Sequence, residues 1–440
     1  MASGSAVANG SGPNVSEQLW ELVQTAVADE QFDPGADRAR VGQIATEVVS
    51  QYGREAAVGA GLPLGNPTAM IDRLVRLVCD YGPFTEALRP DSGVEEVFIE
   101  DERAFLIADG RLRGLTEPTS AAMNRHVIDK LLADTTVSLD AATPRVQAQV
   151  LGGRARLTAI GPPLIDEGGI SACIRLYRQQ RATLDDLLRW GSSTPAANNF
   201  LALLMREPGA LVLSGQPGAG KTTAFAAVLS AIPENFCARI AEDYPELPRP
   251  IFGRNYRTRP PDADGRGAVT LRDLVRDALG MSAKFIGIGE VRGAESFEIA
   301  RGLHAGTGFG VTCHSHSAPD ALEALVLTAM QAGPNVNERM VRMAFASQID
   351  VVVHVERDDP NRLADGDPYR RQITQIHALD PELREDRFST HAVFERPGGL
   401  GTPLVYTGKP PGPALTERLE RLLPKGRKLV QVLKGQVGIT

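Results

Sequence analysis

The sequence predicts an α/β protein: a domain built on a parallel sheet, preceded by a smaller α+β domain and by N-terminal helices. The length of 440 residues is too great for one ordinary core, so more than one domain is expected. Past Pro208, buried runs such as ALVLSG and FIGIGE alternate with helical patterns. This alternation is typical of a parallel sheet with helices on both faces. From about Val94, shorter strand-like runs with turn signals precede it, which predicts the α+β domain.

The N-terminal part of the chain divides into a lead and a helical region. Residues 1–14, MASGSAVANGSGPN, lack the charged head and the apolar stretch of a signal peptide, so we interpret them as a disordered lead. Residues 15–90 place apolar side chains at helical spacing, as in RARVGQIATEVVSQYG and TAMIDRLVRLVCDYG. This spacing predicts two or three amphipathic helices. They serve either as a packing layer, which we favour, or as a separate functional module.

Residues 91–181 carry the pattern of the α+β domain. VEEVFIED and AFLIADGRL are expected strands, with a turn at Asp109-Gly110, and the helix SAAMNRHVIDKLLAD follows them. RVQAQV and ARLTAIG are joined at Gly152-Gly153, which is a hairpin signal. GGISACIRLYR supplies one more strand. The expected product is a compact domain that ends near Arg181.

The remaining residues hold the linker, the main domain and an extension. Residues 182–208 contain the predicted linker helices LDDLLRW and TPAANNFLALLMRE. Residues 209–384 form the predicted parallel-sheet domain, in which DVVVHVERDD and RRQITQIHAL suggest a closing strand pair. Residues 385–440, including TERLERLLPKGRKLVQVLKG, are expected to be a helical C-terminal extension with a basic end.

The composition limits the class of protein. Hydrophobic residues make up 42% and charged residues 23%, as in soluble globular proteins. No apolar run approaches the ~18 residues that span a bilayer, so we expect a cytoplasmic protein that contacts membranes only through partners. The 4 cysteines include no CxxC pair, which indicates reduced thiols. The net charge of −7 argues against stable nucleic-acid binding, although a local basic channel is compatible with it.

The segment GQPGAGKT, Gly215–Thr222, matches the phosphate-loop pattern GxxxxGK[ST]. It follows the apolar strand ALVLSG and opens the helix TTAFAAVLSAI, whereas a chance glycine-rich turn would lack this context. The glycines let backbone N–H groups turn toward phosphates at the positive end of a helix. Lys221 is expected to reach the β- and γ-phosphates, and the Thr222 hydroxyl to hold Mg²⁺. The predicted nucleotide-binding residues of the loop are Gly215, Gln216, Pro217, Gly218, Ala219, Gly220, Lys221, Thr222 and Thr223.

Two acidic strand ends follow the loop. FIGIGE ends in Glu290, and Gly289 stands where the usual metal-binding aspartate is expected. A glutamate at this place can bind Mg²⁺ through water and polarise the attacking water. ARIAEDYPEL supplies a second cluster with Glu242, Asp243 and Glu246. One acidic turn alone is more often a solvated loop, but two acidic strand ends after a phosphate loop favour a site.

Charge that develops on a γ-phosphate needs cationic donors. NYRTRPP offers Arg257 and Arg259 close to the acidic cluster, and an arginine finger contributes roughly 10³–10⁵ in rate. A solvated basic loop is the alternative. Arg272, Arg276 and Arg292 are weaker candidates of the same kind.

The segment GVTCHSHS raises the question of a metal site. In an extended strand His314 and His316 share one face, while Cys313 points to the other. A closed zinc site needs about four converging ligands, and no CxxC pair supplies the rest. We therefore expect no structural metal here, a buried Cys313, a surface His316, and a His314 that donates to the γ-phosphate.

Taken in order, GQPGAGKTT, AEDYPEL, NYRTRPPDADGRGAVTLRDLVRDALGM, FIGIGEVRG and TCHSHS resemble the CpaF-like branch of the type II/type IV secretion ATPases. The likeness spans nearly the whole chain. It implies a RecA-like P-loop ATPase domain that uses ATP and Mg²⁺. It also implies that Glu242, Asp243 and Glu246 are the acidic box, Glu290 the Walker B glutamate and His314 the signature histidine. In the N-terminal domain, Arg156 and Arg175 match arginines that contact the nucleotide.

The resemblance implies a hexameric motor that powers pilus assembly of the Flp or tight-adherence type, or type II/IV secretion. Such a motor works at the inner face of the cytoplasmic membrane with an inner-membrane platform protein. Two alternatives stay open: a conjugative DNA-transfer ATPase of the same superfamily, and a nucleotide-binding scaffold that hydrolyses little. The chain departs from the family pattern at Ala305, Gly306 and His316, and at Gly280 and Ser282, where two arginines are usual. These two lost arginines motivate the scaffold.

Overall fold

The computed structural model divides the chain into two compact units, Met1–Gln179 and Gln180–Thr440, and each is described by itself. The structure describes residues 15–165, 169–177, 182–261, 264–302, 307–364 and 367–439. The predicted disordered lead and the departures at Ala305 and Gly306 therefore lie outside the described residues.

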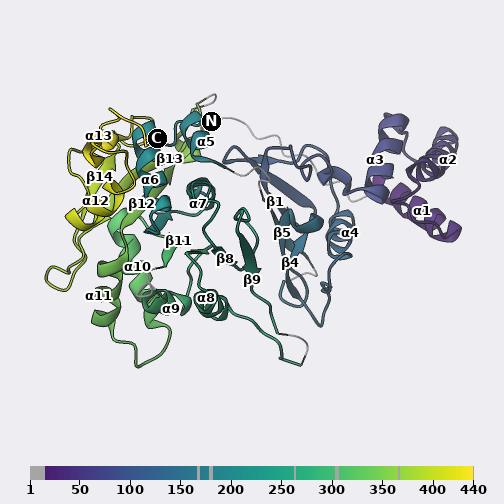
Figure 1. Ribbon diagram of the computed structural model, residues 1–440. Coiled ribbons are helices and arrows are strands. Elements are labelled where there is room, and N and C mark those ends of the chain that lie inside the picture. Colours follow the sequence, from purple (N-terminus) through teal and green to yellow (C-terminus); the bar gives the residue numbers. More distant parts are fainter. Residues whose placement is uncertain are drawn as a thin grey trace. The chain divides into compact units, whose positions relative to one another are not determined.

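Three helices begin the first unit, as the apolar spacing predicts: α1 (Val15–Glu30), α2 (Arg38–Ala57) and α3 (Pro67–Cys79). The Asp37 and Asn66 side chains cap α2 and α3 by accepting a backbone N–H of the first turn. Leu19, Val41 and Leu74 belong to the apolar core that the three helices share. Figure 1 shows the three helices side by side. The helices are thus amphipathic and packed on one another.

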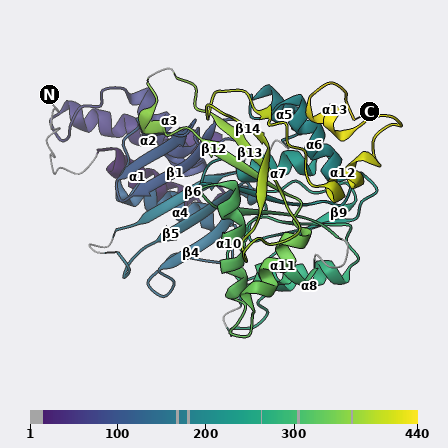
Figure 2. The ribbon, with the colours of Figure 1, turned by 90° about the vertical axis from the view of Figure 1, so that its left-hand side faces the viewer.

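A six-stranded antiparallel sheet forms the rest of this unit, in the order β3-β2-β1-β6-β5-β4 (Figure 2). Its strands are β1 (Val94–Glu100), β2 (Arg103–Ala108), β3 (Arg111–Gly114), β4 (Arg145–Val150), β5 (Ala155–Ile160) and β6 (Ser171–Leu176). The helix α4 (Ala121–Leu132) lies between β3 and β4 in the chain. The predicted turn at Asp109-Gly110 joins β2 to β3, and both residues have positive φ. Gly152-Gly153 lies between the paired strands β4 and β5. The α+β pattern and both hairpins are confirmed.

The second unit is built on a nine-stranded sheet with helices on both faces. Its strands are β7 (Ala210–Gly215), β8 (Ala238–Glu242), β9 (Gly253–Arg257), β10 (Phe285–Ile288), β11 (Gly308–His314), β12 (Val351–Arg357), β13 (Arg371–Leu379), β14 (Thr390–Glu395) and β15 (Val405–Tyr406). Its helices are α5 (Leu184–Arg189), α6 (Pro195–Arg206), α7 (Lys221–Leu229), α8 (Leu271–Gly280), α9 (Glu295–Gly302), α10 (Ala318–Met330), α11 (Glu338–Gln348), α12 (Pro413–Glu420) and α13 (Leu429–Leu433).

The strand order is β15-β14-β13-β12-β7-β11-β10-β8-β9. The strands from β12 to β9 are parallel, and the pairs β12–β13, β13–β14 and β14–β15 are antiparallel. Alternate residues of β7 enter two cores: Leu211 and Leu213 pack with α6 and α7, whereas Val212 packs with α8, α10 and α11. Figure 1 shows these helices around the sheet. The predicted parallel sheet and its closing strand pair are confirmed.

The sheet continues past the start of the C-terminal extension that the sequence places at residue 385. β14 and β15 pair onto β13. Leu419 of α12 and Leu429 of α13 are buried in the same core as α6 and α7. The predicted linker and extension residues thus contribute to the core of the second unit, and the exact domain limits stay a prediction. Within the described ranges, no helix combines the length and apolar character that crossing a bilayer requires.

Candidate active site

The phosphate loop connects the buried strand β7 to the N-terminus of α7. Gly215 has a φ of 150°, and a Cβ at this position would lie 2.2 Å from the backbone oxygen of Val355. Gly220 has a φ of 94° and stands directly before Lys221, where α7 begins. Only glycine takes both the backbone angle and the close approach without strain. The loop therefore turns directly into the N-terminus of α7, as the sequence predicts.

Lys221 lies under the loop with only 7% of its surface exposed. Its Nζ donates to the backbone oxygen of Gln216 at 3.1 Å and lies 3.0 Å from Nδ1 of His314. An ammonium group has only donors, so Nδ1 of His314 must accept and the ring proton belongs on Nε2. That Nε2 atom lies 2.7 Å from Oε1 of Glu290. A continuous chain of contacts thus runs from the phosphate loop to the acidic end of β10.

Glu290 follows β10 and is held by both neighbouring backbone and side chains. The hydroxyl of Thr312 on β11 donates to the backbone oxygen of Gly289 at 2.6 Å, and the backbone oxygen of Thr312 accepts the Val291 N–H at 3.0 Å. Nη2 of Arg292 lies 2.6 Å from the second carboxylate oxygen of Glu290. Burial acts to raise the pKa of Glu290, but the contacts with His314 and Arg292 together outweigh it and lower the pKa to about 2. The carboxylate is therefore ionised.

Glu242 ends the neighbouring strand β8 in a different environment. It is 2% exposed, and one carboxylate oxygen accepts the backbone N–H groups of Glu246 and Leu247 at 3.0 and 2.8 Å. The other oxygen accepts from Asn255 of β9 at 3.2 Å. Burial raises the pKa of Glu242 to about 7, although these hydrogen bonds lower it in part. Glu242 thus ties the turn after β8 to strand β9.

The position of Glu242 explains the missing aspartate of the second nucleotide motif. A Cβ added at Gly289 would lie 3.0 Å from Cγ of Glu242. This separation is closer than ordinary van der Waals contact. The Glu242 stem therefore occupies the space into which a side chain at residue 289 would point, and the acidic group of this strand is carried by the next residue, Glu290.

The other predicted acidic and basic residues are spread over the ends of β8 and β9. Asp243 accepts from the Thr258 hydroxyl at 3.1 Å. The hydrogen bond with Glu290, followed by the charges of Glu290, Asp243 and Glu246, raises the pKa of Arg292 despite its partial burial. Asp243 and Glu246 therefore contribute negative potential at Arg292.

Arg257 and Arg259 lie at the edge of the sheet. Arg257 is the last residue of β9, and Arg259 pairs through its backbone with Val269. Three strands, β8, β10 and β11, separate β9 from the strand of the phosphate loop. Their action on a γ-phosphate therefore stays a prediction.

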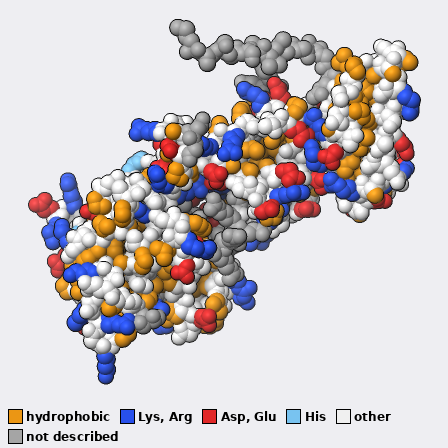
Figure 3. Space-filling view, turned by 90° about the horizontal axis from the view of Figure 1, so that it is seen from above, with side chains coloured by type: hydrophobic (Ala, Val, Ile, Leu, Met, Phe, Trp, Pro, Cys, Tyr) orange, Lys and Arg blue, Asp and Glu red, His pale blue; other side chains and the backbone are white. Residues whose placement is uncertain are grey.

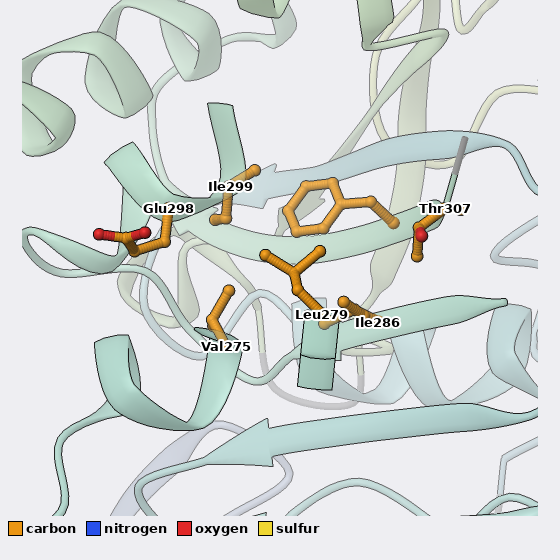
Figure 4. Close-up of a pocket in the computed structure, with 8 residues that line it drawn as sticks. Val275, Leu279, Ile286, Glu298, Ile299 and Thr307 are labelled. Atoms are coloured by element: carbon orange, nitrogen blue, oxygen red, sulfur yellow. The ribbon is translucent and has the colours of Figure 1, made fainter. Parts of the chain in front are cut away.

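Arg272 and Arg276 have a different partner from the one that the sequence suggests. Both lie 2.8 Å from the buried carboxylate of Glu298 in α9, which also contacts Arg301 at 3.3 Å. Glu298 borders a small pocket lined mainly by Val275, Leu279, Ile286 and Ile299, and its carboxylate points away from the apolar centre (Figure 4). These arginines thus brace α8 against α9.

Arg156 and Arg175 belong to the first unit. They are cross-strand partners on β5 and β6, and Nε of Arg175 lies 3.8 Å from a carboxylate oxygen of Glu96 on β1. The structure brings these two arginines together on one face of their own sheet. Their contact with a nucleotide stays a prediction.

The GVTCHSHS segment forms the end of β11 and the turn after it. Cys313 is buried at 3% exposure, and His314 and His316 are exposed, as the alternation predicts. Among the described residues, no group of three or more His, Cys, Asp or Glu side chains is arranged to hold a metal ion. The histidine that matters is His314, which links Lys221 to Glu290.

Sequence reasoning missed the residues on the other side of the phosphate loop. Arg357 at the end of β12 lies against Gly218, and Arg371 at the start of β13 lies against Gly220. Below the loop, Ser214 of β7 and His354 of β12 are hydrogen-bonded at 2.8 Å. The sequence contained a signal for them. The predicted closing strand pair DVVVHVERDD and RRQITQIHAL has Arg357 near the end of its first strand and Arg371 near the start of its second, and these two residues pair.

The comparisons with known proteins agree with this geometry. The model of the type II/IV secretion system protein family matches residues 94–361, more than half of the chain. The chain belongs to this family. The resemblance drawn from the motifs is confirmed, and with it the activity of a secretion ATPase. The sheet topology described above confirms the fold class. As a member of this family, the protein is a nucleotide-binding enzyme.

The names of the curated relatives refer to conjugal transfer and to type IV secretion. A Mycobacterium tuberculosis protein, described as acting in conjugal transfer, is 30% identical over 286 residues, which cover 63% of this chain and 80% of the relative. The type IV secretion system protein PtlH homolog of Bordetella bronchiseptica is 31% identical over 263 residues, covering 54% and 75%. The type IV secretion system protein VirB11 of Brucella suis is 27% identical over 277 residues, covering 54% and 76%.

Solved structures of two ATPases match part of this chain. The VirB11 ATPase of the Brucella suis type IV secretion system has 23% identity and a TM-score of 0.35, covering 65% of this chain and 92% of that chain. The Legionella pneumophila ATPase DotB has 17% identity and a TM-score of 0.47, covering 68% of this chain and 80% of that chain.

Proposed function

We propose that the protein is a homo-hexameric motor that hydrolyses ATP to power pilus assembly of the Flp or tight-adherence type, or type II/IV secretion. It would work in the cytoplasm at the inner face of the cytoplasmic membrane, which it would reach through an inner-membrane platform protein. The observation that carries the proposal is the chain of contacts from Lys221 through His314 to Glu290.

This chain of contacts gives each residue a task in hydrolysis. A triphosphate in the loop offers Lys221 charged oxygen acceptors, which bind an ammonium group more strongly than a neutral imidazole nitrogen does. Lys221 would therefore move its hydrogen bond from His314 to the β- and γ-phosphates. Glu290, ionised because its pKa is about 2, would accept a hydrogen bond from the attacking water and orient it. His314, which contacts both residues, would lose its hydrogen bond from Lys221 when the γ-phosphate binds and so change its contact with Glu290.

The donor set also fits Mg²⁺. Thr222 follows Lys221 in the first turn of α7, and the ionised Glu290 adds carboxylate oxygens. Hydroxyl and carboxylate oxygens suit this hard cation. We propose that Thr222 holds the ion directly and that Glu290 holds it through water. When bound, Mg²⁺ would neutralise charge on the phosphates.

The other predicted site residues enter the proposal in supporting tasks. Asp243 and Glu246 would keep Arg292 oriented beside Glu290, as their effect on the pKa of Arg292 supports. Glu242 would position the turn that carries them. Arg257 and Arg259 from the sheet edge, and Arg156 and Arg175 from the first unit, would donate to phosphates, either in the same subunit or across a subunit boundary. The geometry supports a positioning task for Glu242 more than a chemical one.

The test is phosphate release by the full-length protein with Mg-ATP, with and without its membrane partner. The wild-type protein should turn over ATP. Lys221→Ala should lose nucleotide binding, because it removes the buried ammonium group, whereas Lys409→Ala on an exposed loop should behave as wild type. Absence of phosphate release under both conditions, with nucleotide binding intact, would favour a weakly hydrolysing scaffold over a motor.

The ring is tested separately by mass photometry at low protein concentration. Six-subunit particles should form or increase when Mg-ATP is added, because nucleotide that binds the assembled form stabilises it. Lys221→Ala should not respond to ATP. A monomer with full turnover in both conditions contradicts the hexamer.

A conjugative DNA-transfer ATPase is the second candidate, favoured by the conjugal-transfer description of the Mycobacterium tuberculosis relative. Such a role would involve DNA or the proteins bound to it. On the face that Figure 3 displays, Lys and Arg side chains are interspersed with Asp and Glu, which supports the first candidate over stable DNA binding. Stimulation of turnover by DNA at physiological salt would favour the second candidate.

A further inference from the structure

The phosphate loop has cationic side chains on the side away from Glu290. β7 lies between β11, which carries His314, and β12, which ends in Arg357. The guanidinium of Arg357 lies 3.8 Å from the position of a Cβ on Gly218. The aliphatic part of Arg371 comes within 3.6 Å of the equivalent position on Gly220. The contacts from Lys221 through His314 to Glu290 therefore lie on one side of the loop, and two arginines lie on the other.

Tyr369 contacts both arginines, one through its hydroxyl and the other through its ring. Nη1 of Arg357 donates to the Tyr369 hydroxyl at 2.8 Å, and the guanidinium carbon of Arg371 lies 5.0 Å from the centre of the Tyr369 ring. A planar guanidinium fixed in this way loses little entropy when it binds a phosphate oxygen. All three residues are partly buried.

The strand order decides which part of a nucleotide reaches these arginines. The γ-phosphate must lie on the β11 and β10 side, because Glu290 and His314 end or follow those strands. Lys221 and the loop N–H groups take the β- and γ-phosphates. With the γ-phosphate there, the α-phosphate at the other end of the phosphate chain would lie away from Glu290, on the β12 side. There it meets Arg357 first.

We propose that Arg357 binds the α-phosphate of the nucleotide from the same subunit, with Arg371 as a second cation and Tyr369 as the positioning residue. This inference rests on the proposed nucleotide site and adds a contact that recognises a nucleoside polyphosphate at its nucleoside end. ATP and ADP share the α-phosphate, so the contact contributes equally to both. It lowers the dissociation constant and the KM without changing the chemical step.

The test compares ADP with its phosphorothioates in the full-length protein. Binding of ADP, of both ADPαS diastereomers and of ADPβS is measured by competition with a fluorescent nucleotide. The wild-type protein should bind at least one ADPαS diastereomer more weakly than ADP, because sulfur is a poor acceptor at the α-phosphate. Arg357→Gln should weaken ADP and ATP binding about tenfold, as expected for one charge-assisted hydrogen bond. The variant should then distinguish ADP from ADPαS by less than about twofold.

Control variants separate an α-phosphate contact from support of the loop. Arg370→Gln is the matched control, since the Arg370 side chain faces Asp358 at 3.8 Å and not the loop. It should bind all ligands as wild type does. Tyr369→Phe removes only the acceptor for Arg357 and should lose part of the discrimination against ADPαS. If Arg357 only stabilised the loop and did not contact a phosphate, Arg357→Gln would weaken the binding of ADP, ADPαS and ADPβS by one common factor. That result contradicts the proposal.

Arg357→Lys is the second variant, for the case in which Arg357→Gln folds poorly. It keeps the charge but not the planar fork, so ADP binding should stay within a few-fold while discrimination between the ADPαS diastereomers is lost. Unchanged discrimination in both variants overturns the inference, as does a wild-type protein that binds ADP and ADPαS equally. A wild-type protein that binds no nucleotide at all contradicts the proposed function itself.

Discussion

Glu242 and Glu290 stand at the ends of the adjacent parallel strands β8 and β10, yet their surroundings are opposite. Glu242 is buried among backbone N–H groups and the Asn255 amide. Glu290 is close to two cationic or proton-donating side chains, Arg292 at 2.6 Å and His314 at 2.7 Å. Burial dominates at Glu242 and raises its pKa to about 7, whereas the partners of Glu290 prevail over burial and lower its pKa to about 2.

The difference shows how one acidic pattern provides two kinds of carboxylate. Two glutamates at the ends of neighbouring strands would repel each other if both were ionised and close. A protonated or partly protonated Glu242 serves as an internal hydrogen-bonding group that fixes the turn after β8. The ionised Glu290 is left to face the phosphates and their water. The first is thus suited to positioning and the second to chemistry.

The largest expected effect comes from Glu290→Gln. The amide keeps the size of the side chain but loses the charge that orients water, so turnover should fall about a hundredfold or more. Nucleotide binding should survive, because Lys221 and the loop are untouched. ATP affinity and phosphate release measured on the same preparation provide the check.

Two matched variants accompany this measurement. Glu382→Gln removes an exposed glutamate of the same unit and should leave turnover unchanged. Glu242→Gln should keep turnover within a few-fold of wild type at pH 7 if the comparison between the two carboxylates is right. Equal losses of turnover in Glu242→Gln and Glu290→Gln would mean that both carboxylates act in the chemistry.

The second prediction concerns stability and pH. Because the pKa of Glu242 is raised from 4.5 to about 7, the folded protein keeps a proton that the unfolded chain releases in this range. The free energy of unfolding contributed by Glu242 is therefore full below pH 4.5 and falls as pH rises to 7, by on the order of 3 kcal/mol. Glu242→Gln has no such proton and should lose this slope. Urea unfolding followed by circular dichroism at pH 5.5 and 7.5 measures it.

Glu290 does not disturb this measurement. Its pKa is lowered to about 2, so the stability that it contributes is present above pH 4.5 and is lost only as pH falls toward 2. Between pH 5.5 and 7.5 its charge is constant in both folded and unfolded protein. Parallel pH profiles for wild type and Glu242→Gln would show that the carboxyl of Glu242 is ionised throughout, contrary to its burial.

Sequence patterns were sufficient for the elements and for the local motifs. The loop at Gly215–Thr222, the strand that ends at Glu290 and the alternation of Cys313 and His314 follow from spacing within a few residues. The parallel sheet follows from the repeated order of strand and helix. These features depend on neighbours in the chain, so the sequence contains them directly.

The partners of the charged side chains could not be predicted, because they depend on strand order. Arg272 and Arg276 were candidates for the γ-phosphate, but α8 packs on α9 and both pair with Glu298. Arg357 and Arg371 were overlooked, because only the pairing of β12 with β7 in the structure places Arg357 beside the loop. The environment of Glu242, buried and hydrogen-bonded to Asn255 of β9, likewise appears only when β8, β9 and β10 are assembled.

The smallest expected effect comes from Gly289→Ala, which tests the contact between the two strand ends. The added Cβ would lie 3.0 Å from Cγ of Glu242, so one of the two must move, and the free energy of unfolding should fall by about 1 kcal/mol. In a Glu242→Ala background the obstructing Cγ is gone, and the same change should cost less than about 0.3 kcal/mol. Gly280→Ala is the control, because a Cβ there meets nothing within 4 Å. Urea unfolding of the four proteins of this cycle gives the coupling energy. An equal cost of Gly289→Ala in both backgrounds would show that Glu242 does not occupy the space beside residue 289, and the missing aspartate would need another explanation.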